Sequence, residues 1–240
     1  MGYVIPRSYI DNFSDGIEAI SSAHKRLLAS ALAGVDLSQP GAEDVVVSLI
    51  QNVCDSSTKS AAYLAKRFYL GLRSQMVVDD GYEGVTDTGY VPGATETATR
   101  GIMSAMDYAN VIAGLQERVG YETKRASHRT VYACGLSDPK RPRFARIPQP
   151  SKSYAAGCPF CQMLASRGFV YASRATASVH THDGCRCVVV PSWDTSPTAE
   201  GYEPKDYWDG YQRYLAHDYS QPDRTTPHRS LEWQSEHSGE

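Results

Sequence analysis

Four of the six cysteines and two of the seven histidines in this chain lie within thirty residues of one another. The stretch begins with CPFC at residues 158–161 and ends with HTHDGCRC at residues 180–187. Thiolate and imidazole are the ligands that Zn²⁺ takes in closed structural sites. The residue types in this cysteine window therefore predict metal binding.

The spacing within the window offers five candidate ligands for the four positions of a tetrahedral ion. They are Cys158, Cys161, His182, Cys185 and Cys187. The C-x2-C turn places two thiolates near one ion, and the H-x2-C-x-C segment supplies the rest from a second piece of chain. Cys185 and Cys187 are two residues apart, so a strand would direct both to one face, and either can be the fourth ligand. His180 is an alternative to His182.

Other interpretations of the window remain open. Its cysteines could be buried as apolar residues or paired in a disulfide. A Cys–His nucleophile pair or a redox C-x2-C would make the protein an enzyme, but neither explains why three further ligands lie nearby. A C2H2 DNA-binding finger needs a second histidine three to five residues after the first, followed by a helix, whereas CRCVVVP after His182 is typical of a strand.

The rest of the chain offers no recognisable catalytic set. Cys54 and Cys134 each stand alone in an apolar helical stretch, which predicts core packing. The sequence contains no G-x-S-x-G, no H-E-x-x-H and no phosphate-binding loop. We therefore expect a protein without hydrolytic activity.

Neither a signal peptide nor a membrane span is expected. The N-terminal residues lack a basic region followed by an apolar run, and no stretch approaches ~18 apolar residues. A reducing cytosol is therefore the expected compartment, where clustered cysteines hold metal more often than they form disulfides.

Charge is unevenly distributed around a formal net charge of -3. Residues 119–150 carry seven Lys or Arg and two acids, whereas residues 193–240 carry ten acids and four bases. The simplest expectation is two solvated faces of opposite sign. Alternatively, the basic segment from Lys124 to Arg146 contacts an acidic protein surface or, without sequence preference, DNA. The protein surface is favoured because the acidic C-terminal third would repel a duplex.

Hydrophobic periodicity predicts a mainly helical N-terminal half. Helices are expected over residues 14–34, with Ser14 as N-cap, over 45–53, over 56–76 and over 96–118, the last continuing as a basic helix to about residue 132. The glycine- and aspartate-rich residues 79–93 are expected to form a loop.

Two short β-like runs frame the cysteine window, namely RFARIP at residues 143–148 and VVVP at residues 188–191. The predicted fold is α+β, with a helical region over residues 1–134 and a small β-containing module over 135–193. Residues 194–240 are expected to form a helix beginning at Pro204 and a flexible tail. A structural Zn²⁺ is expected to stabilise the module. It would take the place of a hydrophobic core, which a segment of about fifty residues can hardly form alone.

The combination of RFARIP, CPFCQMLASRGFVY and HTHDGCRCVVVP resembles the phage Mu F-like minor capsid proteins, which are head-morphogenesis proteins of tailed bacteriophages. The resemblance covers about residues 143–193. The motif cysteines and histidine of that family correspond to Cys158, Cys161, His182, Cys185 and Cys187 here.

The resemblance implies a virion or procapsid component that acts in head assembly, DNA packaging or ejection. It implies association with the portal protein or the major capsid protein, contact with packaged DNA without sequence preference, and no membrane. Its location would be the capsid interior or portal vicinity, after assembly in the host cytoplasm. It brings no catalytic residues. A capsid maturation protease, or a zinc-dependent DNA-binding protein or nuclease, remains the alternative.

Overall fold

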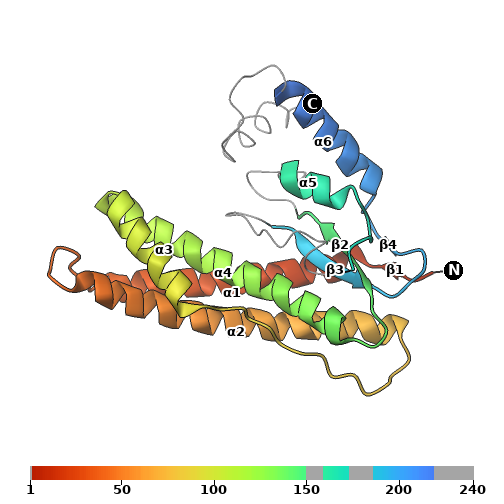
Figure 1. Cartoon of the computed structure of the whole chain (residues 1–240), viewed down its shortest axis with the longest axis horizontal. Helices are drawn as coiled ribbons and strands as arrows, with labels where there is room; N and C mark the ends of the chain where they lie inside the picture. The colour runs from red at the N-terminus through yellow and green to blue at the C-terminus, as the bar shows by residue number, and fades with distance from the viewer. Residues whose placement is uncertain (1, 150–158, 173–185, 219–240) are drawn as a thin grey trace.

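The computed structural model describes residues 2–149, 159–172 and 186–218. Within these ranges the chain forms six helices and two two-stranded sheets, which confirms the mainly helical α+β class (Figure 1). No helix in the described part of the chain combines the length and apolar character needed to cross a bilayer.

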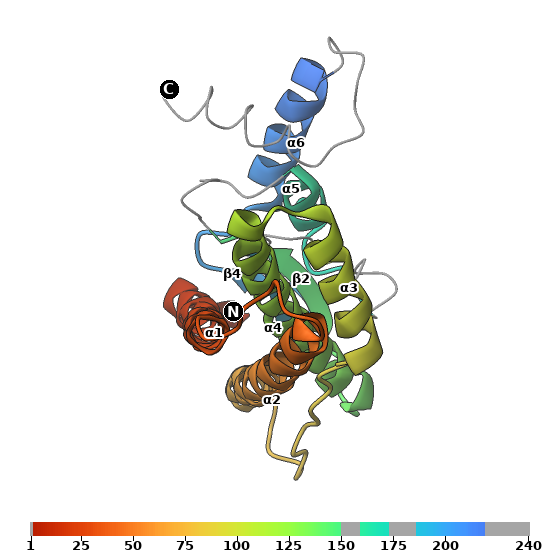
Figure 2. The ribbon, with the colours of Figure 1, turned by 90° about the vertical axis from the view of Figure 1, so that its left-hand side faces the viewer.

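Four helices form an elongated bundle. They are α1 (Arg7–Leu32), α2 (Ala42–Met76), α3 (Pro92–Ala105) and α4 (Tyr108–Ser137). α4 packs against the other three, as the view along the bundle shows (Figure 2). At one end the bundle is held by Leu28 of α1, Ile50 of α2 and Leu115 of α4, which lie in one buried cluster. α4 is therefore buried on several sides.

The first two helices are longer than the sequence indicated. α1 begins at Arg7 after Pro6, and Ser14 is buried within the helix, so the prediction of Ser14 as N-cap was wrong. The two helices expected over 45–53 and 56–76 are one continuous helix. The hydroxyls of Ser57 and Thr58 donate to the carbonyls of Cys54 and Asp55 in the preceding turn, so these polar residues are satisfied without interrupting α2.

The single helix predicted over residues 96–118 is two helices. Asp107 ends the connection and caps α4, because its carboxylate accepts a hydrogen bond from the Asn110 amide at 3.0 Å. The buried face of the first turns of α4 consists of Val111, Leu115 and Val119. The loop expected over 79–93 is confirmed, with α3 beginning at Pro92.

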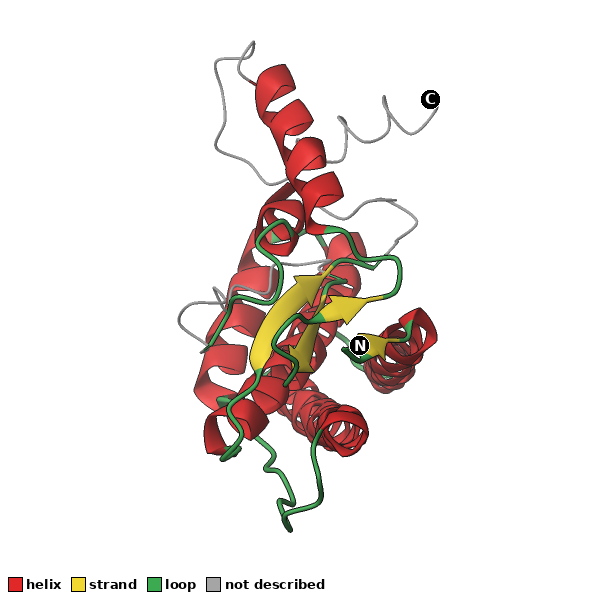
Figure 3. Cartoon of the chain, turned by 90° about the vertical axis from the view of Figure 1, so that its right-hand side faces the viewer, coloured by secondary structure: helices red, strands yellow, loops and turns green. Residues whose placement is uncertain are grey.

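Both predicted β-like runs form strands and pair with each other. β2 (Arg143–Ile147) is antiparallel to β3 (Val188–Ser192), with Ile147 opposite Val188. A second, parallel pair joins β1 (Val4–Ile5) to β4 (Thr198–Ala199), so the start of the chain is tied to the segment after the cysteine window (Figure 3). α5 (Pro159–Ala165) and α6 (Pro204–Asp218) pack on each other, and α6 begins at Pro204 as predicted.

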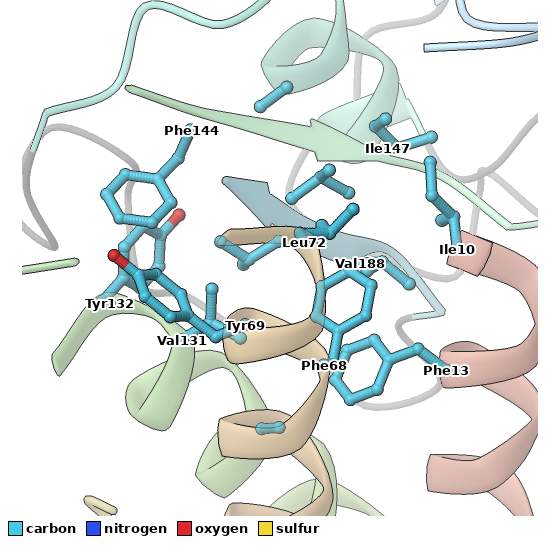
Figure 4. Packing of buried hydrophobic residues seen from close by; sticks show 14 of the residues in the cluster. Ile10, Phe13, Phe68, Tyr69, Leu72, Val131, Tyr132, Phe144, Ile147 and Val188 are labelled. Atoms are coloured by element: carbon cyan, nitrogen blue, oxygen red, sulfur yellow. The ribbon is translucent and has the colours of Figure 1, made fainter. Parts of the chain in front are cut away.

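One hydrophobic core joins the strands to the helical bundle. Side chains from α1, α2, α4, β2 and β3 meet in it, and Figure 4 shows ten of them labelled: Ile10, Phe13, Phe68, Tyr69, Leu72, Val131, Tyr132, Phe144, Ile147 and Val188. The phenyl rings of Phe13 and Phe68 stack with centroids 4.1 Å apart. β2 and β3 therefore share their core with the helical bundle, and the expectation that zinc replaces a core in the module stays a prediction.

The division of the chain into residues 1–134, 135–193 and 194–240 stays a sequence-based prediction. The shared core contains residues of all three segments, including Ala199 and Tyr202 of the third, and β1 of the first segment pairs with β4 of the third. The tail predicted at the end of the third lies outside the described residues.

Candidate metal centre

The structure describes two of the five predicted ligands, Cys161 and Cys187. Cys158, His182 and Cys185 lie outside the described residues, as does the alternative His180. Among the described residues, no three His, Cys, Asp or Glu side chains are grouped as a metal site. The structure therefore bears on the predicted zinc site only through the surroundings of Cys161 and Cys187.

Cys161 and Cys187 lie together although they come from different segments. Cys161 is in α5, and Cys187 immediately precedes β3. Their exposed fractions are 2% and 1%, and they form a small buried cluster. Two sulfur donors from the two ends of the window thus meet away from solvent, as a closed tetrahedral zinc site requires.

Arg146 of β2 lies beside this pair. Its side chain is fully buried, at 0% exposure, and its guanidinium Nη2 donates a hydrogen bond to the Cys187 sulfur. Burying a guanidinium is unfavourable unless an acceptor carrying negative charge is near. The Cys187 sulfur supplies one acceptor for this buried guanidinium.

His128 of α4 fixes the main chain of the same cysteine. Its Nε2 lies 2.8 Å from the Cys187 carbonyl oxygen. Since a carbonyl only accepts, Nε2 carries the proton in this contact. Lys124, one helical turn earlier on α4, is also buried. These residues were missed as site residues, although Arg146 lies within the RFARIP motif and Lys124 and His128 have helical i, i+4 spacing.

The residues present fit a structural zinc ion. The two visible candidates supply sulfur, they converge from separate segments, and a buried cation contacts one of them. A site made from Cys161, Cys187 and two ligands from Cys158, His182 and Cys185 would have the donor set that Zn²⁺ prefers.

The basic segment is not a solvated positive face, so that expectation was wrong. Lys124 and Arg146 are buried, Arg125 donates to buried Glu122 at 2.9 Å, and Arg129 pairs with Asp87 at 2.8 Å. The exposed cations of the segment are Lys140, Arg141 and Arg143. Four of the seven basic side chains of the segment are therefore buried or held in ion pairs within the protein.

A second buried polar cluster fastens the strands to the bundle. The Asp138 carboxylate, just beyond α4, accepts hydrogen bonds from Tyr69 and Arg73 of α2, each at 2.8 Å, and from the Trp193 indole at 3.1 Å. Burial alone would raise the pKa of Asp138, but the hydrogen bonds from Arg73, the Lys140 amide and Tyr69 outweigh it and hold the pKa below its ordinary value. Arg73 is itself buried in this cluster.

The two isolated cysteines occupy the core, as predicted. Cys54 and Cys134 are both fully buried free thiols. Burial raises the pKa of the Cys54 thiol to about 12, and burial also raises that of Cys134, whose sulfur donates to the Val85 carbonyl at 3.1 Å. Protonated thiols of this kind are poor metal ligands.

A family comparison decides where this chain belongs. Residues 4–214 match the family described as VG15 protein in one continuous stretch. The chain belongs to the VG15 protein family. The match to VG15 runs from β1 into α6, so it includes the bundle, both sheets and the whole cysteine window. Comparisons of this VG15 protein with curated proteins and with solved structures give no match.

Proposed function

We propose that this VG15 protein is a minor capsid or head-morphogenesis protein of a tailed bacteriophage. It would be a structural component near the portal or in the capsid interior, and it would act in head assembly, DNA packaging or ejection. The proposal rests on the Mu F-like combination of RFARIP, CPFC and HTHDGCRCVVVP. The described parts of these motifs fold against one another, since β2 pairs with β3 and Cys161 lies with Cys187.

The proposed Zn²⁺ has a structural role. When bound, it would crosslink α5 to the segment that precedes β3, through Cys161 and Cys187 and through ligands from Cys158, His182 and Cys185. Both described thiols are buried, so neither presents a nucleophile to a macromolecular substrate. This burial favours a scaffold over the alternative of a maturation protease or a zinc-dependent nuclease.

α6 is the element best placed to contact a portal or capsid subunit. It projects from the strand end of the molecule, away from the axis of the bundle (Figure 1). Tyr207 packs within the protein, against Tyr202, with the two ring centroids 5.6 Å apart. Trp208 remains 46% exposed and lies beside Tyr211, with ring centroids 6.1 Å apart. Tyr211 is half-buried, and a pair of aromatic side chains that is partly exposed in this way is a typical anchor at protein interfaces.

Co-expression with a portal ring tests the proposal. We expect pull-down of the portal to recover this protein in a fixed, low ratio, and the double variant Trp208→Ala/Tyr211→Ala to reduce recovery at unchanged far-UV circular dichroism. Tyr63→Ala is the matched control, because Tyr63 is an exposed aromatic on α2, far along the chain from α6. Cleavage of the major capsid protein by the purified chain, abolished by one point mutation, would show instead that the protein is an enzyme.

A further inference from the structure

We propose that the turn between α4 and β2 is a docking element for an acidic segment of a partner protein. This basic turn, residues 138–143, carries three exposed cations, Lys140, Arg141 and Arg143. In the part of the chain that the structure describes, none of the three forms an ion pair with an acid. The basic turn lies outside the candidate metal centre and outside α6, so it is an additional surface.

The backbone of the basic turn is anchored to the buried core through Asp138. The Lys140 amide donates to the Asp138 carboxylate at 2.8 Å, and the Arg141 amide donates to the Asp138 carbonyl at 3.1 Å. Pro139 occupies the second position of the resulting β-turn, where its fixed φ is favourable. Because side chains of α2 hold the same carboxylate, the cations are ordered before a partner binds. Less binding energy is then needed to order them.

Arg141 has a backbone conformation that arginine rarely adopts. Its φ of 44° makes it the one non-glycine residue with a positive φ among the described residues. It also precedes Pro142, and the residue before a proline is normally extended. Glycine would adopt a positive φ at less cost. An arginine at this position therefore indicates a role for its exposed side chain, since strained residues are concentrated at functional sites.

The surroundings of the three cations favour a protein over a nucleic acid as the partner. Leu136, two residues before Asp138, is 62% exposed, and Val170 is 53% exposed. Val170 lies beside Arg143, whose Nη1 donates to the Val170 carbonyl at 3.4 Å. Aliphatic side chains next to cations match an acidic peptide that also carries apolar residues. A duplex presents a row of phosphates, which gain nothing from aliphatic contacts.

The chemistry of the cations sets the kind of binding that we expect. The guanidinium groups of Arg141 and Arg143 can each donate two parallel hydrogen bonds to a carboxylate, whereas the Lys140 ammonium acts as a point charge. Each contact is weak because the cations are exposed, and salt screens it. The basic turn therefore predicts binding that needs several carboxylates together and weakens as the salt concentration rises.

Fluorescence anisotropy with labelled polyanions at low salt tests the class of partner. The probes are poly-L-glutamate, a random copolymer of glutamate and tyrosine, and a duplex DNA of matched charge. We expect the full chain to bind the copolymer most tightly, because the aliphatic side chains contact its apolar residues. The protein has a formal net charge of -3, so binding of a polyanion requires a local basic surface. Tighter binding of the DNA, or no binding of either polypeptide, would overturn the proposal.

Arg141→Gly separates docking from stability. We expect a higher midpoint of thermal unfolding, since glycine accommodates the positive φ, together with about 2- to 5-fold weaker copolymer binding from the loss of one exposed ion pair. A purely structural role for Arg141 would not produce this opposite pair of effects. Arg26→Gln is the matched control, because it removes one exposed cation from α1 and should leave binding unchanged. Wild-type affinity in Arg141→Gly, or an equal loss in Arg26→Gln, would contradict the assignment.

The double variant Lys140→Gln/Arg143→Gln tests the other two cations, and it keeps the proposal testable if Arg141→Gly does not fold. Both side chains are exposed, so we expect a folded protein with about 4- to 25-fold weaker copolymer binding, twice the free-energy effect of one exposed ion pair. Unchanged affinity in this variant would refute the docking role of the basic turn.

Discussion

At the scale of single residues, the most informative side chains are the buried ionised ones. Asp138 receives hydrogen bonds from Tyr69, Arg73 and Trp193, and Arg73 also pairs with Asp80 at 2.8 Å. We expect Asp138→Ala to lower the free energy of unfolding by about 3 kcal/mol, because it leaves a buried guanidinium with a weaker set of acceptors. Urea unfolding measures this change. Asp55→Asn, which removes an exposed pair with Lys59, should change stability by less than about 1 kcal/mol.

The same carboxylate predicts a pH dependence. Because the pKa of Asp138 is lower in the folded protein than in the unfolded chain, its stabilising contribution is complete above the ordinary pKa of about 4. That contribution is lost as the pH falls through the folded value. The difference in unfolding free energy between wild type and Asp138→Asn should therefore be constant from pH 7 to about pH 5 and shrink below about pH 4. A difference that grows on acidification would contradict this.

The isolated cysteines give a prediction about metal content. Cys54→Ala and Cys134→Ala each remove one fully buried sulfur, so each should cost about 1 kcal/mol of stability through lost packing. Neither should change the zinc content, which we expect to be one ion per chain by elemental analysis. Halved zinc content in either variant would show that the ligand assignment is wrong. A metal-free wild type with Cys158 and Cys161 in a disulfide would remove the site altogether.

At the scale of elements, two helical glycines differ only in what surrounds them. A Cβ added at Gly135 of α4 would lie 2.1 Å from the Phe144 ring, whereas one added at Gly101 of α3 would meet nothing within 4 Å. Gly135 thus permits β2 to pack closely on α4, where the rings of Tyr132 and Phe144 lie 4.9 Å apart. This close approach explains how a short strand becomes part of the helical core.

Alanine at the two glycines should therefore have opposite effects. Gly101→Ala should stabilise the protein by up to about 1 kcal/mol through helix propensity. Gly135→Ala should destabilise it by about 1–3 kcal/mol, since the clash outweighs the same propensity gain. Thermal unfolding of both variants measures the signs, and stabilisation by both would mean that β2 does not pack on α4 as described.

At the scale of the whole molecule, the core shared by the strands and the bundle determines how removal of the metal affects stability and helical structure. We expect chelation of the zinc to lower the midpoint of thermal unfolding, because an ion that binds only the folded state at 1,000 times its Kd contributes about 4 kcal/mol. The helical circular dichroism signal at 25 °C should persist, since β2 and β3 are packed on the bundle without the ion. Loss of that signal on chelation would show that the bundle depends on the metal.

The distribution of exposed charge predicts weak DNA binding. Only Lys140, Arg141 and Arg143 of the basic segment are exposed, so at most about three phosphates can be neutralised there, with a salt slope no steeper than about -2.7. Fluorescence anisotropy with duplex DNA should detect no tight binding at physiological salt. Tight binding there, abolished by Lys140→Gln/Arg143→Gln, would make DNA a partner in preference to an acidic protein surface.

The sequence by itself determined the α+β class, the approximate positions of most helices, both strands that frame the cysteine window and the burial of Cys54 and Cys134. These features follow from local periodicity and from the apolar character of short runs, which need no knowledge of distant residues. The prediction of one continuous helix over residues 96–118 was wrong. The interruption depends on a single capping residue, Asp107, within an otherwise continuous hydrophobic pattern.

Only the tertiary structure decided which charges are internal. Lys124 and Arg146 belong to the segment that was expected to form a solvated face, yet both are buried, and so is Arg73. Arg73 meets Asp138 sixty-five residues away, and Arg146 meets the Cys187 sulfur forty-one residues away. A buried ion is stable only beside its partner. Local periodicity carries no information about such a partner, so the surroundings of the candidate metal centre appear only when α4, β2 and the segment before β3 are folded together.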